Sequence, residues 1–490
     1  MRLSKSRFVA GVICLKRLYW QVHEPELAAE PRESTQAIFD QGNEVGRLAQ
    51  QLCPGGIEVE GSHEDLDQAI RQTKELMANR EVPAIFEATF EEGGVLVRVD
   101  ILQRQRDRWR LIEVKSSTEM KDHYLYDLGI QRRVVSRCGL ELSSACIMHL
   151  NRAYVYPGGE YDIRQLFRIR MLNPQVAALQ PQIGKRVAEE FRILDQPNAP
   201  EIAPGDHCGD PFVCEFFDRC NPPVPVDHVR HLPRIQARAL EKLKSMGIAS
   251  IFHVPDDFPL NERQRRACTS VQQGKPWFSE DLPRVLDSLK FPLYFMDFET
   301  VYPAIPRHPG MRPYDQLPFQ WSVHVQDEQG ADLRHYEFLA TTGADPRREF
   351  VETLCSALEN KGSVVVYNQG FESQRLSDLA GWVPGFRTRV KGIQARLWDL
   401  WPIIRNHVYH PAFAGSFSLK AVLPALVPEM TYVGMDVADG NQAGVAWERL
   451  VRGGLDATDR NRLGKALLAY CGQDTLAMVK LVEGLRCQRA

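Results

Sequence analysis

Residues 291–300 read FPLYFMDFET, and this stretch restricts the fold more than any other. Its apolar run is typical of a buried strand, and alternate strand residues share a face, so Asp297 and Glu299 project together. Further elements are predicted as strands at 319–325, 333–339 and 363–367 and as a long helix at 459–485. We therefore expect an α/β unit over residues 289–490.

Two later stretches carry matching acidic residues. VVVYNQGFE (364–372) reads as a strand that leads into Glu372, and LLAYCGQDT (467–475) as a helix with Tyr470 and Asp474 on one face. Carboxylates converging from two strand ends and a helix would repel one another without cations. Two Mg²⁺ or Mn²⁺ ions would neutralise them and hold the attacking and leaving oxygens of an in-line displacement. The alternative is a set of unrelated acidic surface positions.

These three stretches resemble the DEDD exonuclease superfamily, which has an RNase H-like fold. Its motifs D-x-E, N-x-x-(F/Y)-D and Y-x-x-x-D correspond to the segments beginning at Asp297, Asn368 and Tyr470. The resemblance implies metal ligands at Asp297, Glu299, Glu372 and Asp474. It also implies that Tyr470 orients the nucleophilic water, as in polymerase proofreading domains and RNase D. Glu372 stands where the superfamily has aspartate.

Two more residues between the second and third motifs are candidates. Asp399, in RLWDLWP, is a further acid that could assist this site. GSFSLK (415–420) resembles the Ser-Leu helix start that is common between those motifs. Lys420 in it is a candidate phosphate contact, although a solvated lysine is the favoured interpretation.

A second candidate site lies upstream in a predicted antiparallel meander. Its strands are AIFEATF (84–90), GVLVRVDIL (94–102) and WRLIEVKSS (109–117). Glu113 and Lys115 share a face of the third strand, and Asp100 can meet them from the second. Two carboxylates hold a hard cation such as Mg²⁺, and a lysine can orient the attacking water. E-x-K alone also occurs on ordinary charged surface strands, but Asp100 and Gln131 on the following helix strengthen the signal.

These residues resemble the RecB-like branch of the PD-(D/E)XK nucleases, which have a restriction-endonuclease-like fold. The resemblance implies catalytic roles for Asp100, Glu113, Lys115 and Gln131. In that branch a preceding helix carries Gly-x-x-x-His, and the equivalent stretch here runs from Gly42 to Gly46. Glycine thus replaces the histidine, and Glu44 is the candidate for supplying a metal-facing oxygen instead.

The chain has 11 cysteines, and three of them lie in HCGDPFVCEFFDRC (207–220). An odd number in a long chain without an export signal favours metal or cluster ligation over a disulfide framework. The candidate ligands are Cys14, Cys208, Cys214 and Cys220. One remote cysteine and a close trio suit an iron–sulfur cluster, whereas zinc usually takes two C-x₂₋₄-C pairs. Zinc and buried, inert cysteines remain the alternatives.

The cysteine layout resembles the iron–sulfur RecB-type nucleases, including the AddB nuclease domain and the CRISPR spacer-acquisition nucleases. In these the first cysteine precedes the nuclease core and three follow it. The resemblance implies a [4Fe–4S] cluster that closes the domain over residues 1–225. The pairing of both domains, with GSFSLK and YNQGFE, also resembles an uncharacterised bacterial family that fuses them.

Length and composition predict about three parts in this 490-residue chain. Between the nuclease-like regions we expect a helical connector at 226–288. It contains LEKLKSMGIASI (240–251), which is typical either of a helix-hairpin-helix or, more often, of a helical spacer. The net charge is −3, which neither favours nor excludes a nucleic-acid partner, because metal-binding carboxylates lower the total. No run of 18 apolar residues occurs, so we expect a cytoplasmic protein without a membrane segment.

The leading functional prediction is a metal-dependent nuclease that processes DNA in repair or defence. The C-terminal domain would trim 3′ ends, and the N-terminal domain would hold a second nuclease site. The alternatives are RNase D-like RNA trimming and a non-catalytic nucleic-acid-binding module with degenerate sites. No G-x-x-x-x-G-K-[ST] loop is present, so a helicase activity would come from a partner protein. Oligomeric state and the polarity of the N-terminal site stay open.

Overall fold

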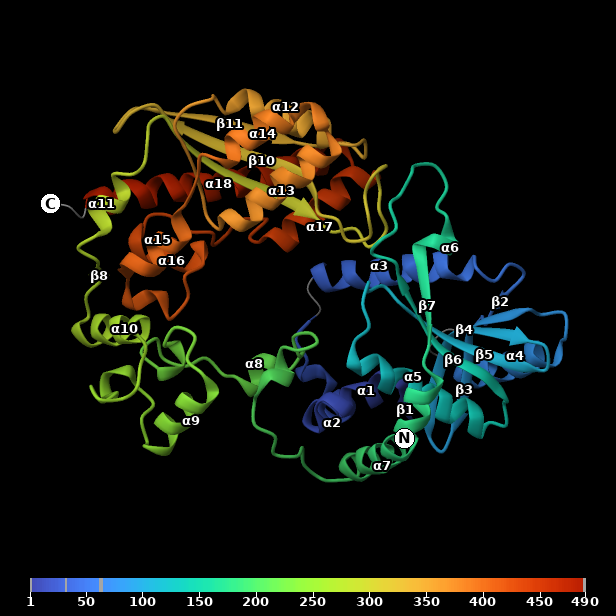
Figure 1. Cartoon of the computed structure of the whole chain (residues 1–490). Helices are drawn as coiled ribbons and strands as arrows, with labels where there is room; N and C mark the ends of the chain where they lie inside the picture. Colours follow the sequence, from blue (N-terminus) through green and yellow to red (C-terminus); the bar gives the residue numbers. More distant parts are fainter. Residues whose placement is uncertain (1, 31–32, 61–64, 488–490) are drawn as a thin grey trace. The chain divides into compact units, whose positions relative to one another are not determined.

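The computed structural model describes residues 2–30, 33–60 and 65–487. The chain divides into two compact units (Figure 1). Unit 1 comprises residues 1–223 with 303–315, and unit 2 comprises 224–302 with 316–490. Both contain sheets covered by helices, which confirms the predicted α/β class. Residues 226–288, expected as a connector, therefore belong to the same unit as the C-terminal sheet.

Unit 1 is built on a seven-stranded sheet ordered β2-β3-β4-β5-β6-β7, with β1 pairing parallel to β4. The strands are β1 (Leu3–Ser4), β2 (Ile57–Glu58), β3 (Ala84–Glu92), β4 (Val95–Gln105), β5 (Arg108–Lys115), β6 (Leu142–Leu150) and β7 (Phe167–Met171). β3, β4 and β5 are successive antiparallel neighbours, which confirms the predicted meander. Gly93 and Gly94 have φ of 59° and 76° at its first turn, a backbone region that favours glycine.

Helices cover both faces of this sheet. The α-helices in the described part of unit 1 are α1 (Lys5–Ile13), α2 (Leu15–His23), α3 (Glu33–Gln50), α4 (Leu66–Ala78), α5 (Asp122–Arg137), α6 (Ile163–Leu166), α7 (Asn173–Leu194) and α8 (Phe217–Cys220). Leu102 and Leu111 pack into a core shared with α1, α5 and α7, whereas Ile101 and Ile112 pack with α3. Because strand residues alternate between faces, Glu113 shares the face of Leu111 and points towards α5.

A buried acid lies in the helical layer of unit 1. Glu190 of α7 is fully buried, and neither carboxylate oxygen has a hydrogen-bond partner. Burial raises its pKa from the usual 4.5 to about 9, although Arg186 opposes the shift. The side chain packs against α1, where a Cβ added at Gly11 would lie 2.5 Å from its Cδ. Unit 1 therefore favours the protonated form of Glu190.

We predict that Glu190→Gln raises the free energy of unfolding at pH 7 by about 3 kcal/mol relative to wild type, because folding of the wild type must protonate a carboxylate that is ionised in the unfolded chain, whereas glutamine is neutral in both states. The folded-state pKa is raised, so the wild-type contribution is complete below pH 4.5 and is lost as the pH rises towards 9. Urea denaturation at pH 5 and pH 7 should show the difference widening. Glu201→Gln, at an exposed position of unit 1, is the control; parallel pH curves for wild type and Glu190→Gln would contradict the prediction.

Unit 2 contains a five-stranded sheet ordered β11-β10-β9-β12-β13 and a small β8–β14 pair. Its strands are β8 (Trp277–Phe278), β9 (Leu293–Val301), β10 (Leu317–Gln326), β11 (Leu333–Leu339), β12 (Ser363–Val366), β13 (Leu397–Asp399) and β14 (Val408–Tyr409). β9, β10 and β11 pair antiparallel, while β12 runs parallel to β9 and β13. The four strands predicted in this region are confirmed.

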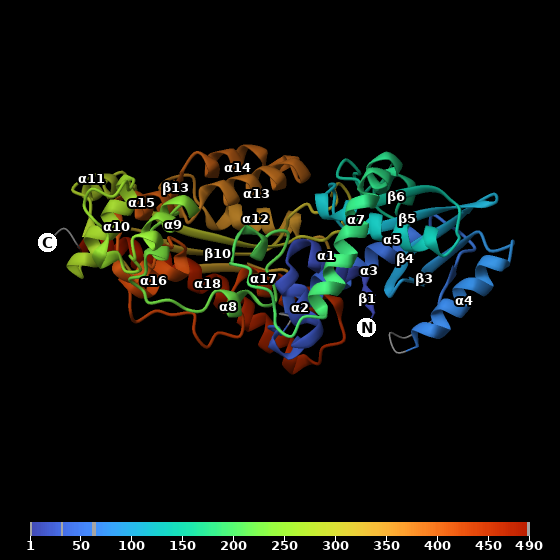
Figure 2. The ribbon, with the colours of Figure 1, turned by 90° about the horizontal axis from the view of Figure 1, so that it is seen from below.

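Helices of unit 2 flank the sheet on two sides (Figures 1 and 2). One core joins the sheet to α12 (Arg347–Ala357), α13 (Gln369–Trp382) and α14 (Arg387–Gln394). The predicted long helix is α18 (Ala457–Cys487), which contacts β9 and β10, and α17 (Gly440–Arg452) contacts β9 and α18. The remaining α-helices within the described residues 316–487 are α15 (Leu400–His407) and α16 (Leu419–Leu426).

The helical part before this sheet contains α9 (Ala237–Ser245), α10 (Glu262–Gln273) and α11 (Leu282–Leu286). A turn at Gly247, with φ of 74°, follows α9. A single turn of 3₁₀ helix at Ile251–His253 then stands where a hairpin would have its second helix. Among the described residues, no helix combines the length and apolarity that crossing a membrane requires.

Candidate functional sites

The first candidate site is centred on Glu113 of β5, which is 2% exposed. Its Oε1 accepts a hydrogen bond from Lys115 Nζ at 2.7 Å, and its Oε2 accepts one from Gln131 Nε2 at 2.7 Å. Asp100 lies on the adjacent strand and accepts from the backbone N–H of Val114 at 2.6 Å. The structure thus brings the four residues predicted from the meander and the following helix into one group.

Two residues in the same group were missed by sequence reasoning. Asp127 of α5 accepts hydrogen bonds from Lys115 at 2.5 Å and from Gln131 at 3.0 Å. Lys5 of α1 places its Nζ 2.9 Å from both carboxylate oxygens of Glu113. Asp127 could have been found, because it precedes Gln131 by four residues and so shares its helix face. No spacing in the sequence relates Lys5 to the other residues of the group.

A fourth acid faces the group from β3. Glu87 lies opposite Asp100 in the antiparallel β3–β4 pair, between the paired residues on either side. Its φ is 55°, a conformation that costs free energy in residues other than glycine. Burial raises the pKa of Glu87, while Lys5 opposes the shift. Like charges opposite each other on a sheet are destabilising, so cations are needed here.

Two lysines supply positive charge to this site. Burial disfavours a charged ammonium, but Asp127 and Glu113 outweigh that effect and raise the pKa of both Lys5 and Lys115. The pKa of Asp100 is nevertheless raised, chiefly by burial. Gln131 also keeps its buried Oε1 without a hydrogen-bond partner. The negative charge of the acids is thus only partly compensated by the lysines, and the amide oxygen of Gln131 is not used. Oxygen ligands of this kind are those that a hard divalent cation prefers.

Glu44 occupies a different environment from the acids around Glu113. It is exposed on α3, and its charge acts on Tyr161, whose pKa is raised to about 12 mainly by burial. The described contacts of the Glu113 group do not include it. At Gly46, the position where the motif that this stretch resembles has histidine, an added Cβ would meet nothing within 4 Å. A larger side chain would therefore have space at this position.

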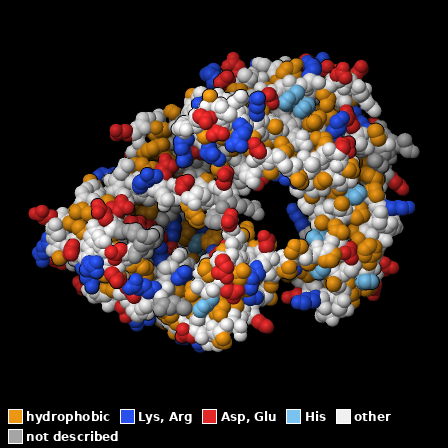
Figure 3. Space-filling model, turned by 180° about the vertical axis from the view of Figure 1, so that it is seen from behind, with side chains coloured by type: hydrophobic (Ala, Val, Ile, Leu, Met, Phe, Trp, Pro, Cys, Tyr) orange, Lys and Arg blue, Asp and Glu red, His pale blue; other side chains and the backbone are white. Residues whose placement is uncertain are grey.

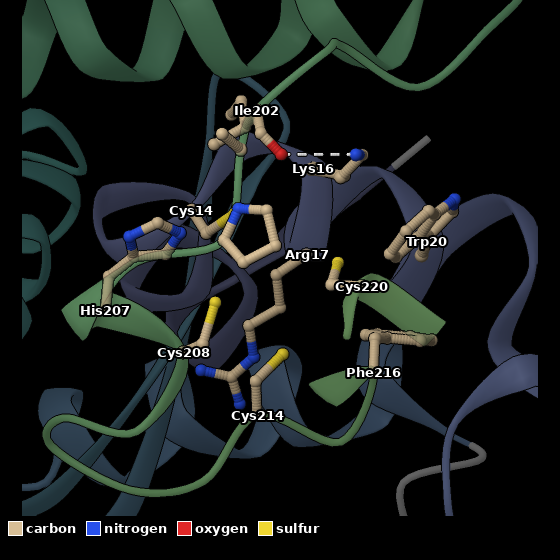
Figure 4. Close-up of a pocket in the computed structure, with 12 residues that line it drawn as sticks. Cys14, Lys16, Arg17, Trp20, Ile202, His207, Cys208, Cys214, Phe216 and Cys220 are labelled. Atoms are coloured by element: carbon tan, nitrogen blue, oxygen red, sulfur yellow. Dashed lines mark hydrogen bonds between the residues drawn. The ribbon is translucent and has the colours of Figure 1, made fainter. Parts of the chain in front are cut away.

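The four candidate cluster cysteines line one pocket in unit 1 (Figure 4). Cys14 caps the C-terminal end of α1, Cys208 ends a 3₁₀ turn, Cys214 lies in a loop and Cys220 ends α8. Figure 4 shows their thiols turned towards a common space. Arg17 lies beside them and pairs with Glu215 at 2.8 Å. The remote cysteine and the trio are thus brought together as the spacing predicted.

The spread of these thiols bears on which metal group they fit. Four thiolates at 2.3 Å from one tetrahedral zinc would be about 3.8 Å apart. In the described part of the chain, three potential ligand atoms within 4.8 Å of one another occur at Asp297, Glu299 and Cys471. Among the described residues the four cysteines do not form such a set, so at least two of their sulfurs lie more than 4.8 Å apart, which is wider than the ligand spacing around one zinc ion.

The second candidate site joins β9, α13 and α18. Asp297 and Glu299 project from β9, Glu372 lies in the first turn of α13, and Tyr470 and Asp474 lie on α18. Glu299, Glu372 and Asp474 are 6%, 2% and 8% exposed. Asp297 and Asp474 are close enough to share a hydrogen bond, as are Tyr470 and Asp474. The structure thus groups the five residues predicted from the three motifs.

Electrostatics in this second site are less balanced than in the first. Burial raises the pKa of Asp297, Glu299 and Glu372 well above their usual values, and repulsion between the carboxylates adds to the shift. Lys420 opposes the shift at Glu299. One buried oxygen of Glu372 has no hydrogen-bond partner. Carboxylates gathered in this way fit divalent cations, which would replace the missing positive charge.

Two further residues join the second site without having been predicted. The hydroxyl of Tyr432 donates a hydrogen bond to Asp474. The thiol of Cys471 is fully buried and donates to the backbone carbonyl of Asp297 at 3.8 Å. Lys420 lies 5.4 Å from the ring centre of Tyr470 and 5.7 Å from that of Tyr432. The Tyr432 segment has no recognisable motif, whereas Cys471 adjoins the predicted Tyr470.

Asp399 has a structural role that sequence reasoning did not assign. Its two oxygens accept backbone N–H groups of Asn368 and Gln369, each at 3.0 Å. It also caps the N-terminus of α15 by accepting from Trp401 at 3.0 Å. Asn368 has φ of 96°, so the turn into α13 is strained and needs such support. Asp399 therefore holds the turn that presents Glu372.

Comparisons with known proteins give limited matches. Residues 294–418 match a family model described as a domain of unknown function, DUF2779. An uncharacterised protein of Mycoplasma pneumoniae, the MG366 homolog, is 27% identical over 219 residues, which cover 40% of this chain and 32% of the relative. Uncharacterised protein UU173 of Ureaplasma parvum is 25% identical over 163 residues, covering 30% of this chain and 23% of the relative. The chain thus spans a third or less of these relatives, and the family model includes Asp297, Glu299 and Glu372 but ends before α18.

Proposed function

We propose that this protein is a metal-dependent nuclease with two active sites, one in each compact unit. The observation that carries the proposal is the grouping of half-buried Asp297 with buried Glu299, Glu372, Tyr470 and Asp474 in unit 2. Carboxylates with raised pKa values that lie close together lower the stability of the fold when they are ionised, and such clusters occur most often at functional sites. The mixed five-stranded sheet supports an RNase H-like fold for this unit.

For the second site we propose 3′–5′ exonuclease chemistry of the DEDD type. Bound Mg²⁺ or Mn²⁺ would polarise the phosphodiester and lower the pKa of a water molecule. Asp297, Glu299, Glu372 and Asp474 would hold the cations. Tyr470 would orient the attacking water, and the hydroxyl of Tyr432 fixes the position of Asp474. The side chain of Glu372 is longer than the aspartate of the superfamily motif. It would still reach the other carboxylates, because it is buried beside them and Asp297 acts electrostatically on it.

For the first site we propose phosphodiester hydrolysis of the PD-(D/E)XK type on a restriction-endonuclease-like fold. Asp100 and Glu113 would bind a divalent cation, and Asp127 faces the same space. Gln131 and Lys115 hold the carboxylate of Glu113 in place. Lys115 would also stabilise charge that develops on the phosphate. We further propose a [4Fe–4S] cluster, bound by Cys14, Cys208, Cys214 and Cys220, that closes unit 1.

We propose DNA as the substrate, with repair or defence as the setting. Figure 3 shows acidic and basic side chains interspersed over one face of the molecule, in keeping with the net charge of −3. Recognition of a polyanion would then depend on groups close to the metal sites rather than on a broad basic surface. RNA trimming is the competing proposal, and a single nuclease assay on DNA and RNA distinguishes the two substrates.

The test uses DNA and RNA of one sequence, labelled at either the 5′ or the 3′ end, with Mg²⁺ or Mn²⁺. We expect metal-dependent degradation of DNA that EDTA abolishes. Shortening of 5′-labelled strands in single-nucleotide steps would identify 3′ trimming. Preference for RNA would support the competing assignment, and no degradation of either polymer would contradict the proposal.

Lys115→Met separates the two sites. We predict that it lowers cleavage by the first site about 10²-fold, because the developing charge loses its ammonium partner, and that it leaves 3′ trimming unchanged. The measurement compares product ladders from 5′-labelled DNA. Lys185→Met, an exposed lysine of α7, is the matched control. Unchanged cleavage of every kind in Lys115→Met would exclude the first site from catalysis.

A further inference from the structure

A lysine from the start of the chain sits among the acids of the first site. Lys5 Nζ lies 2.9 Å from both oxygens of Glu113, 3.7 Å from Asp127 Oδ1 and 3.8 Å from Asp100 Oδ1. Its side chain is 21% exposed. Lys5 is separated from Glu113 by 108 positions in the sequence. The contact therefore depends on tertiary structure and not on local geometry.

The segment that carries Lys5 is anchored at both ends. Leu3 pairs with β4, and its N–H donates to Gly94 O at 2.9 Å. Ser4 then caps α1 by accepting from the N–H of Arg7. Phe8 is fully buried in the core of unit 1, and Cys14 ends the helix in the cysteine pocket. The backbone that carries Lys5 is thus fixed beside the site.

Hydrogen bonds to Glu113 leave little room for another partner. Oε1 accepts from Lys5 and Lys115, and Oε2 accepts from Lys5 and Gln131. Each carboxylate oxygen offers about two lone-pair sites. A divalent cation that binds Glu113 must therefore displace one of these donors. Lys5 is the donor that both oxygens share, so its departure frees the most coordination space.

We propose that Lys5 is a resident counter-ion of the first site that competes with the divalent cation for Asp100, Glu113 and Asp127. This inference rests on the proposed metal-dependent function and adds to it a control of metal loading. Without the cation, Lys5 stabilises carboxylates that would otherwise repel one another. With the cation, Lys5 must withdraw, so occupancy of the site depends on the concentration of free metal.

The experiment measures metal binding directly. It uses the full chain carrying Asp297→Ala and Asp474→Ala, so that Mn²⁺ binding in calorimetry reports the first site. We expect Lys5→Met to bind Mn²⁺ at least about 10-fold more tightly than this parent, since a like charge a few ångströms away is removed. Lys5→Arg, which keeps the charge, should bind like the parent. Arg7→Met, on the same helix, is the control and should also leave the affinity unchanged.

A second readout covers stability in the absence of metal. Lys5→Met should unfold at a lower temperature than the parent in EDTA and recover when Mn²⁺ is added, whereas Arg7→Met should show neither change. Unchanged or weaker Mn²⁺ binding in a folded Lys5→Met protein would overturn the inference while leaving the proposed function intact. Absence of Mn²⁺ binding in every variant would instead overturn the metal-dependent first site itself.

Discussion

Asparagine in place of Asp297 is expected to reduce 3′ trimming by about 10³-fold, because the carboxylate that joins β9 to α18 in the second site is lost. Asp297 faces Asp474 and acts electrostatically on Glu372. An amide keeps the shape of the side chain but binds a divalent cation more weakly. The measurement is the rate of single-nucleotide shortening of 5′-labelled DNA in Mg²⁺ and in Mn²⁺.

Stability distinguishes this effect from simple misfolding. Burial and repulsion raise the pKa of Asp297, so the wild-type fold bears an electrostatic cost when metal is absent. Asp297→Asn should therefore unfold in EDTA at the same temperature as wild type or at a higher one, even though its activity is lost. Asp332→Asn, an exposed position before β11, is the matched control and should change neither quantity. Trimming at the wild-type rate in Asp297→Asn would remove the second site from the mechanism.

The parts of the structure that sequence reasoning predicted are those with local signals. Period-two patterning places Glu113 and Lys115 on one strand face, and a spacing of four places Tyr470 and Asp474 on one helix face. These rules hold within one element, so they stay correct once the element is identified. Asp127 obeys the same helical rule relative to Gln131 and was within reach of the same reasoning.

The features that could not be predicted depend on contacts between residues far apart in the sequence. Lys5 reaches the first site because the short strand β1 pairs with β4, and a two-residue strand has no periodicity to detect. Tyr432 comes from an irregular segment between α16 and α17. Residues 303–315 belong to unit 1 although they follow β9, since Met311 O accepts from the N–H of Tyr156 and Tyr314 donates to Ser116 O. The sequence of residues 303–315 contains no pattern that predicts these hydrogen-bond partners.

The remaining large effect concerns the cysteine pocket. Cys208→Ser is expected to remove the visible absorbance of the proposed cluster and to lower the free energy of unfolding of unit 1 by about 5 kcal/mol. The reason is loop closure: a group bound to Cys14 and Cys208 joins positions almost 200 residues apart, and a cross-link over such a loop is worth roughly that amount.

Purified wild-type and Cys208→Ser proteins would be compared by iron, sulfide and zinc analysis and by urea denaturation under anaerobic conditions. Cys138→Ser, an exposed cysteine outside the pocket, controls for the loss of a thiol. Zinc in place of iron would correct the identity of the metal while keeping the cross-link. Equal stability and no bound metal in either protein would show that these cysteines pack as inert side chains. The grouping of Cys14, Cys208, Cys214 and Cys220 around one pocket argues against that outcome, because a shared metal group requires cysteines from distant parts of the sequence to line one space.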